Sequence, residues 1–410
     1  YAYFNNRRFY REAFALGAPP WGSDLLPTGN FVPDATNLPT QAAVDQVFGS
    51  YGIAAGRVAR SNVLTFNDDA ANSLVSQTGG VNFRGNYGDA LVLSPFNNSL
   101  AYNLGTLQVL TAPTERYNLF ASGHYDVTDW LTVYGQGFYT DYSSVTNYGA
   151  GLQTQGTTAV VPVDNAFIPA DLRTILASRA NPAAPFSMRK LWTATGTSVT
   201  TYDNSVFQVL AGLRGTIGDT GWKWDIYGSH GQTKIDVQQT SGGASFSRIQ
   251  SLLTSRSVAG ANGALVNVPA FIPASGGGNS LVPNPAYAGA TNDGGRSLPG
   301  VGGAAPPCPN GLDLFGDTPL TESCKAFLQI HPTSVTRIKQ TVVEGSLTGE
   351  LFTLPAGPVK MALGSEYRRN SYSFSPDPAG NDLVGSFGSQ PVTGVTTAKE
   401  IYGELLVPIL

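Results

Sequence analysis

The sequence predicts an all-β fold, an antiparallel up-and-down transmembrane β-barrel of which this chain forms a part. Long runs of alternating apolar and polar residues recur in pairs, and a very short turn joins the two runs of each pair. Long segments rich in Gly, Pro, Asn and Ser separate the pairs. Alternation with period two gives a strand one apolar and one polar face. Short turns on one side and long extracellular loops on the other are typical of a barrel that spans a membrane, with the short turns on the periplasmic side.

The expected strands are long and follow one another as hairpins. We expect turns at 127–130, 218–221 and 354–357, and strands at 115–126, 131–148, 207–217, 222–239, 337–353, 358–374 and 396–410. Strands of soluble β-sandwiches usually have about 5–6 residues. Runs of about 12–18 residues can instead tilt across a membrane and project beyond it, which favours the barrel.

The two faces of these strands differ in charge. We expect Leu213 and Leu347 to face lipid, with almost no charge around them. The opposite face collects the charged residues expected to face the lumen: Glu344, Glu350, Lys360, Glu366, Arg368, Glu400 and Glu404. We interpret these as ion pairs and hydrated groups of a polar lumen, not as acid–base catalysts.

Aromatic residues occur on both faces. Trp130, Trp222 and Trp224 are expected near strand ends at the membrane interface, together with Tyr139 and Tyr367. Three further aromatics are predicted to face inward, where they would stack on a ligand or pack against a plugging domain: Phe120, Tyr134 and Tyr402.

The remaining segments predict loops and minor helices. We expect long loops at 149–203, 241–336 and 375–395, the second being a long extracellular loop within a barrel that takes up residues 1–410. A short amphipathic helix is predicted at 40–48 with Thr40 as its N-cap, and another at 321–330. Shorter strands are expected at 1–14, 61–67, 80–87 and 100–109.

Composition and motifs argue against several other classes. Charged residues make up 13% of the 410 residues, about half the usual share, and the formal net charge of −4 speaks against a nucleic-acid partner. No apolar run reaches the length of about 18 residues that a membrane-spanning helix needs. The chain has no nucleophile elbow, phosphate-binding loop or dinucleotide fingerprint, so we expect neither an enzyme nor a cofactor.

The cysteines and histidines predict one disulfide and no metal site. Cys308 and Cys324 are the only cysteines, and two cysteines in an outer loop usually pair. A zinc site would need two more nearby ligands, and only His331 is close in sequence. His124 and His230 lie on separate expected strands. The loops contain no pattern that singles out substrate-binding residues.

Three segments resemble strands and periplasmic turns of TonB-dependent outer-membrane receptors. They are ERYNLFASGHYDVTDW (115–130), GELFTLPAGPVKMALGSEYR (349–368) and KEIYGELLVPIL (399–410), while FIPADL (167–172) resembles a loop motif of the large receptors. The resemblance extends over roughly residues 60–410. It implies a barrel of about 22 strands plugged by an N-terminal domain.

The same resemblance implies a function in the outer membrane of a Gram-negative bacterium. There, the TonB–ExbB–ExbD complex drives uptake of a siderophore, cobalamin, oligosaccharide or similar bulky nutrient, and the barrel contacts lipid and lipopolysaccharide. We expect this chain to be an internal barrel segment without the plug and the C-terminal strands. The alternatives are a passive porin, which would have shorter outer loops, and an extracellular β-solenoid adhesin, which would show a regular short repeat.

Overall fold

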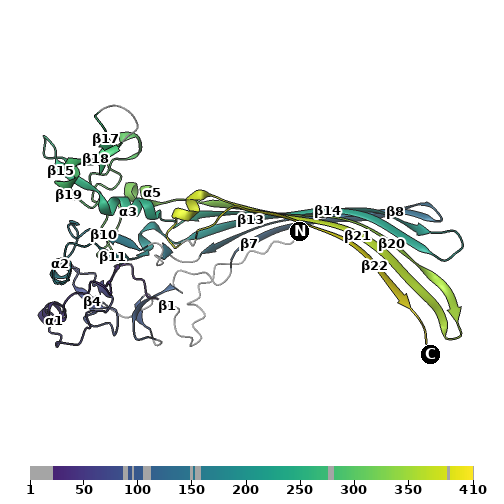
Figure 1. Cartoon of the computed structure of the whole chain (residues 1–410), viewed down its shortest axis with the longest axis horizontal. Helices are drawn as coiled ribbons and strands as arrows, with labels where there is room; N and C mark the ends of the chain where they lie inside the picture. Colours follow the sequence, from purple (N-terminus) through teal and green to yellow (C-terminus); the bar gives the residue numbers. More distant parts are fainter. Residues whose placement is uncertain are drawn as a thin grey trace.

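The computed structural model describes residues 22–85, 91–94, 97–104, 112–147, 151–152, 158–275, 281–385 and 388–409. Over these residues the protein is mostly β, with antiparallel sheets and few helices. A long sheet makes up one end of the molecule, and smaller sheets and helices gather at the other (Figure 1). We call this second part the cap; it comprises the described residues of 22–104, 151–198, 242–332 and 377–391.

The long sheet has seven antiparallel strands in the order β22-β21-β20-β14-β13-β8-β7. Among these seven, strands that follow one another along the chain are therefore neighbours in the sheet. It is open within the described residues, with β22 and β7 as its edges. The strands are β7 (Thr114–Thr128), β8 (Leu131–Asn147), β13 (Val199–Thr216), β14 (Lys223–Ser241), β20 (Thr333–Leu354), β21 (Gly357–Pro376) and β22 (Val392–Leu406).

These strands confirm the seven strands predicted between residues 115 and 410, and most extend beyond the predicted ends. Very short turns join β7 to β8 and β20 to β21. The connection from β13 to β14 closes through a hydrogen bond from the Ile217 amide to the Trp222 carbonyl, 2.9 Å long. Gly218 and Gly221 take positive φ there, a conformation that glycine adopts without a steric cost.

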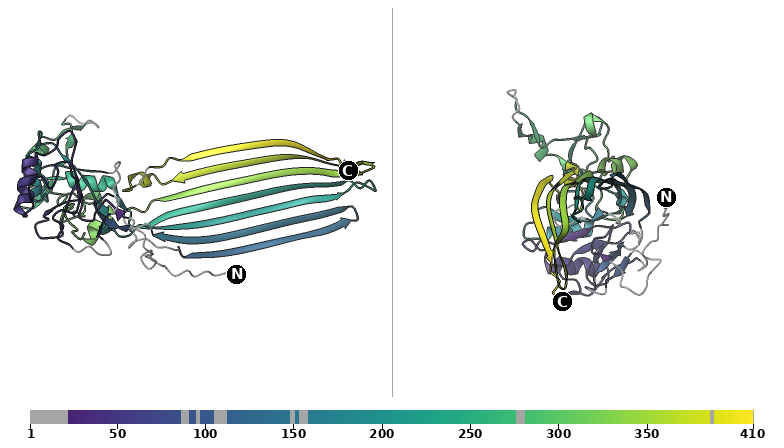
Figure 2. Two further views of the ribbon diagram at one scale, coloured as in Figure 1. Left: turned by 90° about the horizontal axis from the view of Figure 1, so that it is seen from below. Right: turned by 90° about the vertical axis from the view of Figure 1, so that its right-hand side faces the viewer.

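The long sheet is curved, and the cap lies at the end opposite the turns (Figure 2, left). Seen end-on, the strands form an arc, and the first described segments of the chain lie on its concave side (Figure 2, right). The outer face expected from the sequence is the convex one, and the predicted lumen face is the concave one.

The cap is built on a five-stranded antiparallel sheet in the order β10-β11-β2-β3-β4, whose strands come from two distant parts of the chain. They are β2 (Asn30–Val32), β3 (Leu64–Phe66), β4 (Leu74–Ser76), β10 (Ala159–Val161) and β11 (Phe186–Arg189). Four helices pack around this sheet: α1 (Gln41–Ser50), α2 (Ala170–Ala177), α3 (Phe246–Thr254) and α5 (Glu322–Leu328).

Smaller elements complete the cap. β1 (Gly22–Ser23), β6 (Leu100–Asn103) and β5 (Leu91–Leu93) form one sheet, and β9 (Gly151–Leu152) pairs with β12 (Leu191–Trp192). The others are β15 (Arg256–Ala259), β16 (Leu265–Asn267), β17 (Phe271–Pro273), β18 (Leu281–Pro283), β19 (Thr291–Asn292), α4 (Pro285–Ala288), η4 (Thr193–Thr195), η5 (Val301–Gly303) and, after β21, η6 (Pro378–Asp382).

One apolar core joins segments that are far apart in the sequence. Phe315 packs edge-on against Phe66, with ring centroids 5.5 Å apart, and its ring lies 6.3 Å from that of Phe186. The core also takes buried residues from α1, α2, α3 and α5. The segments 149–203 and 241–336, which the sequence predicts to be irregular loops, therefore contribute to a folded unit over their described residues.

The local predictions in the cap have mixed outcomes. Thr40 caps α1 as predicted, and the helix predicted at 321–330 is present as α5 with Thr321 as its N-cap. Each threonine accepts a hydrogen bond from the amide three residues on. Strands β3 and β6 fall within the predicted stretches 61–67 and 100–109. The strand predicted at 80–87 is wrong over its described part: the strand lies at β4, and positive φ at Gly80 and Asn82 turns the chain instead. The strand predicted at 1–14 lies outside the described residues.

A disulfide joins Cys308 to Cys324, the first residue lying in a loop and the second on α5. Both cysteines are fully buried in the cap core. The bond closes a 16-residue separation and ties the loop that precedes Phe315 to a helix of the same core.

Candidate ligand-binding site

The convex face of the long sheet is apolar where it approaches the turns. The register places Leu213 beside Val133 and Ile226, and Leu347 beside Trp224 and Leu363. We call this the apolar belt. Ten of its side chains are exposed although they are large and apolar: Leu119, Tyr125, Val133, Val209, Leu213, Ile226, Val343, Leu363, Ile401 and Leu405.

The three tryptophans lie at the turn end of the sheet. Trp130 is in the turn between β7 and β8 and is 53% exposed. Trp222 packs over Gly349, and Trp224 lies against Gly215. Tyr139 and Tyr367, which the sequence analysis put near strand ends, lie in the middle of β8 and β21 instead, so they are not part of the group of aromatic side chains at the turns.

The concave face holds a network of polar and charged side chains. Tyr227 and Tyr402 both donate hydrogen bonds to Glu344, at 2.5 and 2.8 Å. Arg368 contacts Glu366 at 2.6 Å and Glu400 at 3.8 Å. The structure thus brings these predicted lumen residues together, and they form hydrogen bonds and ion pairs with one another.

Three predicted lumen charges lie farther toward the turns. Lys360 and Glu350 are directly paired across β20 and β21, and their charged groups lie 3.9 Å apart. Glu404 faces the same way on β22, opposite Ala362. All three are within a shallow depression at the turn end of the sheet.

Predicted inward aromatics pack against the sheet itself. The ring of Tyr134 lies over Gly212, and that of Tyr402 lies over Gly364; a Cβ atom at either glycine would be within 2.5 Å of the ring. The Tyr134 hydroxyl donates to Asp225 at 2.6 Å. Phe120 is 64% exposed on edge strand β7.

A pocket of about 520 Å³ lies in the cap between the five-stranded sheet and the sheet that contains β5 and β6. Part of its wall is apolar and includes Phe66, Phe83, Leu100 and Tyr102. Polar groups line the rest: Thr28, Asn67, Asp68, Asp69, Arg84, Thr193 and Asp317. An apolar cavity of this size with a few convergent polar groups is typical of small-molecule sites.

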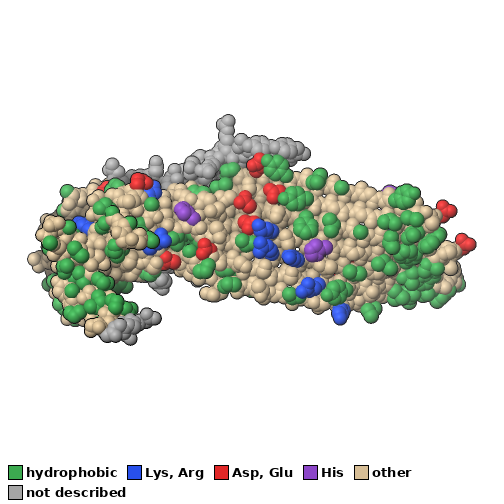
Figure 3. Space-filling model, turned by 90° about the horizontal axis from the view of Figure 1, so that it is seen from above, with side chains coloured by type: hydrophobic (Ala, Val, Ile, Leu, Met, Phe, Trp, Pro, Cys, Tyr) green, Lys and Arg blue, Asp and Glu red, His purple; other side chains and the backbone are tan. Residues whose placement is uncertain are grey.

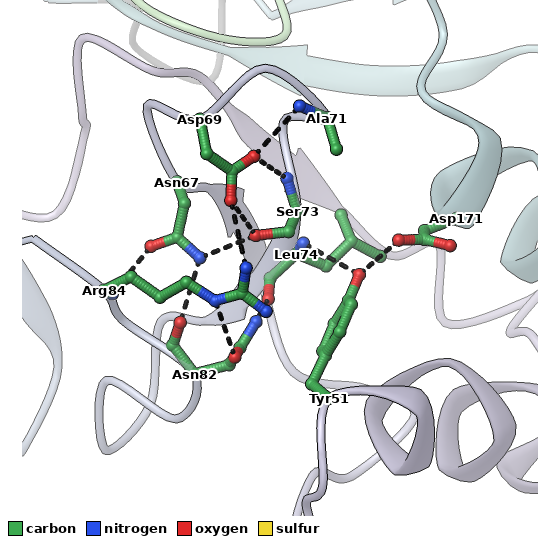
Figure 4. Close-up of polar contacts among 9 residues, drawn as sticks. All are labelled: Tyr51, Asn67, Asp69, Ala71, Ser73, Leu74, Asn82, Arg84 and Asp171. Atoms are coloured by element: carbon green, nitrogen blue, oxygen red, sulfur yellow. Dashed lines mark hydrogen bonds and ion pairs between the residues drawn. The ribbon is translucent and has the colours of Figure 1, made fainter.

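Hydrogen bonds fix the polar side of this pocket (Figure 4). Asp69 accepts the amide and the hydroxyl of Ser73, at 2.9 and 2.5 Å, and contacts Arg84 at 3.4 Å. The Asn67 amide group donates to Ser73 and to the Asn82 carbonyl, each at 2.9 Å. The Asp69 carboxylate is therefore held in place before any ligand enters, with the exposed Arg84 guanidinium next to it.

Electrostatics keep Asp69 ionised. Partial burial acts to raise the pKa of this carboxyl, but the hydrogen bonds from Ser73 outweigh it and the pKa lies below its usual value. Behind the pocket, burial and a hydrogen bond to Asp171 raise the pKa of Tyr51, whose hydroxyl also accepts the Leu74 amide. This tyrosine ties α1 to α2 and β4, and its ring lies 5.4 Å from the Arg84 guanidinium.

A buried lysine lies next to the pocket residue Asp317. The Lys190 ammonium donates to the Gly316 carbonyl at 2.6 Å, and the residue is 2% exposed. Burial lowers the pKa of Lys190 to about 8, against the opposing effect of Asp313 and Asp317. Between pH 8 and the unfolded value near 10.5, the unfolded chain binds more protons than the folded one, so stability rises with pH.

We therefore expect cap stability to rise by about 2–3 kcal/mol between pH 8 and 10.5 and to lack this rise in Lys190→Met. Denaturant unfolding at several pH values, followed by tryptophan fluorescence, measures the difference between the two proteins. Lys325→Met, on the half-buried part of α5, is the control and should keep the rise. Parallel pH profiles for the wild type and Lys190→Met would contradict the assignment.

The histidines do not meet. His124 is on β7, His230 contacts Thr341 at 2.9 Å on the convex face, and His331 lies after α5. Over the described residues, no three His, Cys, Asp or Glu side chains are grouped so that they could hold a metal ion. We also find no described helix with the length and apolar character needed to cross a membrane.

The pocket is the part of the site that sequence reasoning missed. Its residues come from seven separate stretches of the chain, and neither spacing nor periodicity connects Asp69 to Asp317. The segment 167–172 contributes to the core, since Ile168 and Leu172 are buried, and Asp171 anchors Tyr51. No protein-family model matches the chain, and a search of curated proteins finds no match either.

Proposed function

We propose that this chain is a barrel segment of a TonB-dependent outer-membrane receptor. The receptor would import a bulky nutrient, such as a siderophore, cobalamin or an oligosaccharide, with energy from the TonB–ExbB–ExbD complex. In this orientation the short turns face the periplasm and the cap faces the outside. The long sheet forms part of the barrel wall, with its convex face in lipid and its concave face on the lumen.

The observation that carries the proposal is the segregation of charge between the faces of the seven described strands. On β8, β13 and β21 the convex face has no Lys, Arg, Asp or Glu from the turns up to Tyr139, Phe207 and Tyr367. On β22 the first such residue is Lys399, which is paired with Tyr367. Over the same stretch the concave face holds Glu344, Glu366 and Arg368. Exposed apolar side chains in such a continuous belt fit a hydrocarbon environment, and a charge there would be costly.

The difference between the two ends of the sheet supports import by a gated receptor over a passive porin. The turn end has only tight connections, whereas the other end has a cap with its own core and a disulfide. Consecutive antiparallel strands also do not support a β-solenoid, in which successive strands stack in parallel. We propose that the cap pocket captures the nutrient, because binding residues are commonly placed on loops held by a rigid scaffold.

The proposed pocket favours a ligand with both an apolar and a hydroxyl-rich or cationic part. Phe83 and Tyr102, which are only partly buried, offer apolar contact, while Asp69 and Asp317 accept hydrogen bonds and Arg84 donates them. A cavity of about 520 Å³ holds a molecule of moderate size or one part of a larger one.

Uptake by cells tests the proposal. A Gram-negative host that produces the protein is given radiolabelled cobalamin, ferric siderophore or oligosaccharide, with and without an uncoupler of the proton-motive force. We expect the protein in the outer-membrane fraction and uptake of one probe that the uncoupler abolishes. Uptake insensitive to the uncoupler would show a passive porin, and a protein absent from the membrane fraction would refute both.

Variants of the pocket test the capture site. Arg84→Ala and Tyr102→Ala should each weaken binding of the transported probe by about 10-fold, as loss of one charged or aromatic contact does. Arg57→Ala, an exposed residue outside the pocket, is the matched control. Unchanged affinity in both pocket variants would place capture elsewhere.

A further inference from the structure

The cap pocket differs in charge from the outer surface of the long sheet. In the space-filling view, the largest group of Lys and Arg side chains lies over that sheet (Figure 3). The described wall of the pocket instead has three carboxylates and one guanidinium, namely Asp68, Asp69 and Asp317 against Arg84. The wall therefore has an excess of negative charge.

The positive charge of Arg84 is already compensated within the cap. Its guanidinium lies 3.4 Å from the Asp69 carboxylate and 5.4 Å from the centre of the Tyr51 ring. Asp69 also accepts hydrogen bonds from the amides of Ala71 and Ser73 and from the Ser73 hydroxyl (Figure 4). Together, Asp69 and Arg84 therefore present no net charge to a ligand, although Arg84 keeps N–H groups that can donate.

The other two carboxylates of the wall keep their negative charge for a ligand. Asp68 and Asp317 are exposed, and neither makes a hydrogen bond or an ion pair with a residue that the structure describes. The buried Lys190 ammonium attracts Asp317, but it also attracts Asp313, and it donates its hydrogen bond to the Gly316 carbonyl. One ammonium compensates only one of these two carboxylates, so negative charge remains there in addition to that of Asp68.

Aromatic rings and one hydroxyl group complete the wall around these carboxylates. Phe83 and Tyr102 are only partly buried, so a ligand can contact their rings. The face of an aromatic ring attracts a cation as well as an apolar group. The Thr193 hydroxyl oxygen is buried in the same wall and has no hydrogen-bond partner among the described residues. A buried polar atom without a partner is costly, so a hydrogen bond from a ligand to this oxygen would be favourable.

We propose that the cap pocket binds an organic cation that carries a ring. Its ammonium or guanidinium group pairs with Asp68 and Asp317, and its ring packs against Phe83 and Tyr102. Hydrogen bonds between a cation and a carboxylate are stronger than those between neutral groups. An anion of the same shape would be repelled, and a neutral one would leave the excess charge without a partner. The inference rests on the capture role proposed for the pocket, and it specifies the charge of the ligand.

Three indole compounds that differ in charge test the proposal. Tryptamine is a cation at neutral pH, tryptophol is neutral and indole-3-acetate is an anion, while the ring is the same. Each is titrated by calorimetry into the full protein, purified in detergent, at low ionic strength. We expect tryptamine to bind about 10-fold more tightly than tryptophol, and indole-3-acetate to bind more weakly than either. High salt should reduce the preference for tryptamine, because it screens charges that are open to solvent.

Variants of the two free carboxylates locate the cation. Asp68→Asn and Asp317→Asn should each weaken tryptamine binding by about 3-fold, the effect of one partly exposed charge pair, and the double variant should lose the preference. Tryptophol affinity should stay unchanged in all three, which also shows that the pocket remains folded. Glu322→Gln removes an exposed carboxylate of the cap outside the pocket and should keep the full preference.

The wild type alone can overturn the inference, by binding tryptamine and tryptophol equally or by binding none of the three compounds. A preference for tryptamine that survives in the double variant would also overturn it, because the cation would then be held elsewhere. Import is tested separately by energy-dependent uptake. Loss of that uptake with the charge preference intact would overturn the proposed function and not the class of ligand, whereas the reverse result would overturn only the inference.

Discussion

Leu347→Lys should destabilise the folded protein in lipid by about 2–4 kcal/mol, whereas Ser346→Lys, one residue away on β20, should cost less than about 1 kcal/mol. Leu347 lies in the apolar belt between Trp224 and Leu363, its direct partners on the two neighbouring strands. A lysine there would have to place its ammonium group in hydrocarbon or extend it toward the interface.

Ser346 is the matched control because it has the same depth and the opposite face. Its partners on the neighbouring strands are Asp225 and Gly364, so a lysine at this position faces the polar network and can approach an acid. Lumen substitutions change selectivity more than stability. The pair of variants therefore differs in the environment of the new charge and in little else.

Equilibrium folding into lipid vesicles, followed by tryptophan fluorescence in urea, measures both penalties. Trp224, which lies next to Leu347, is one of the five tryptophans that contribute to this signal. Equal penalties at residues 346 and 347 would overturn the assignment of the two faces and, with it, the membrane account. A larger penalty for the lysine at residue 346 would show that the concave face, and not the convex one, is in contact with lipid.

The long strands could be predicted because their signal is local. Each strand has one apolar and one polar face, so residues two positions apart share the same surroundings. Leu213, Ala211 and Val209 on the apolar face of β13 are an example. The turns are equally local, since Gly218 and Gly221 allow the positive φ that the connection needs. The face assignment extends to the polar network, whose Glu344 and Arg368 follow from the same alternation.

The cap could not be predicted in the same way. Strands β3 and β4 have three residues each and are buried on both faces, so their burial shows no alternation. The sequence predicted β3 only as part of a longer stretch and did not predict β4. Their stability depends on contacts with residues more than 100 positions away, such as the packing of Phe66 on Phe315. Abundant Gly and Pro made these segments look irregular, although positive-φ glycines such as Gly294 and Gly311 fit closely against Phe167.

The pocket forms within the cap and could not be predicted from the sequence for the same reason. Asp69 and Arg84 meet because the chain turns at Asn72 and Asn82, both with positive φ, and not because of any motif. Asp317 reaches the same wall through the segment that Phe315 anchors in the core. The ligand site therefore forms only when the core brings the separate loops together.

Phe315→Ala should destabilise the cap by about 3–5 kcal/mol, the usual cost of removing a buried phenylalanine. The side chain is 1% exposed, and its loss leaves a cavity against Phe66 and Phe186. Hydrogen–deuterium exchange on the intact protein should therefore accelerate in β3 and β11, which lie far from residue 315 in the sequence. The exposed Phe271→Ala, at 58% exposure, should change stability by less than about 0.5 kcal/mol. Acceleration confined to the residues around 315 would show that the segments fold as independent loops, and the pocket would then lack the rigid wall that capture requires.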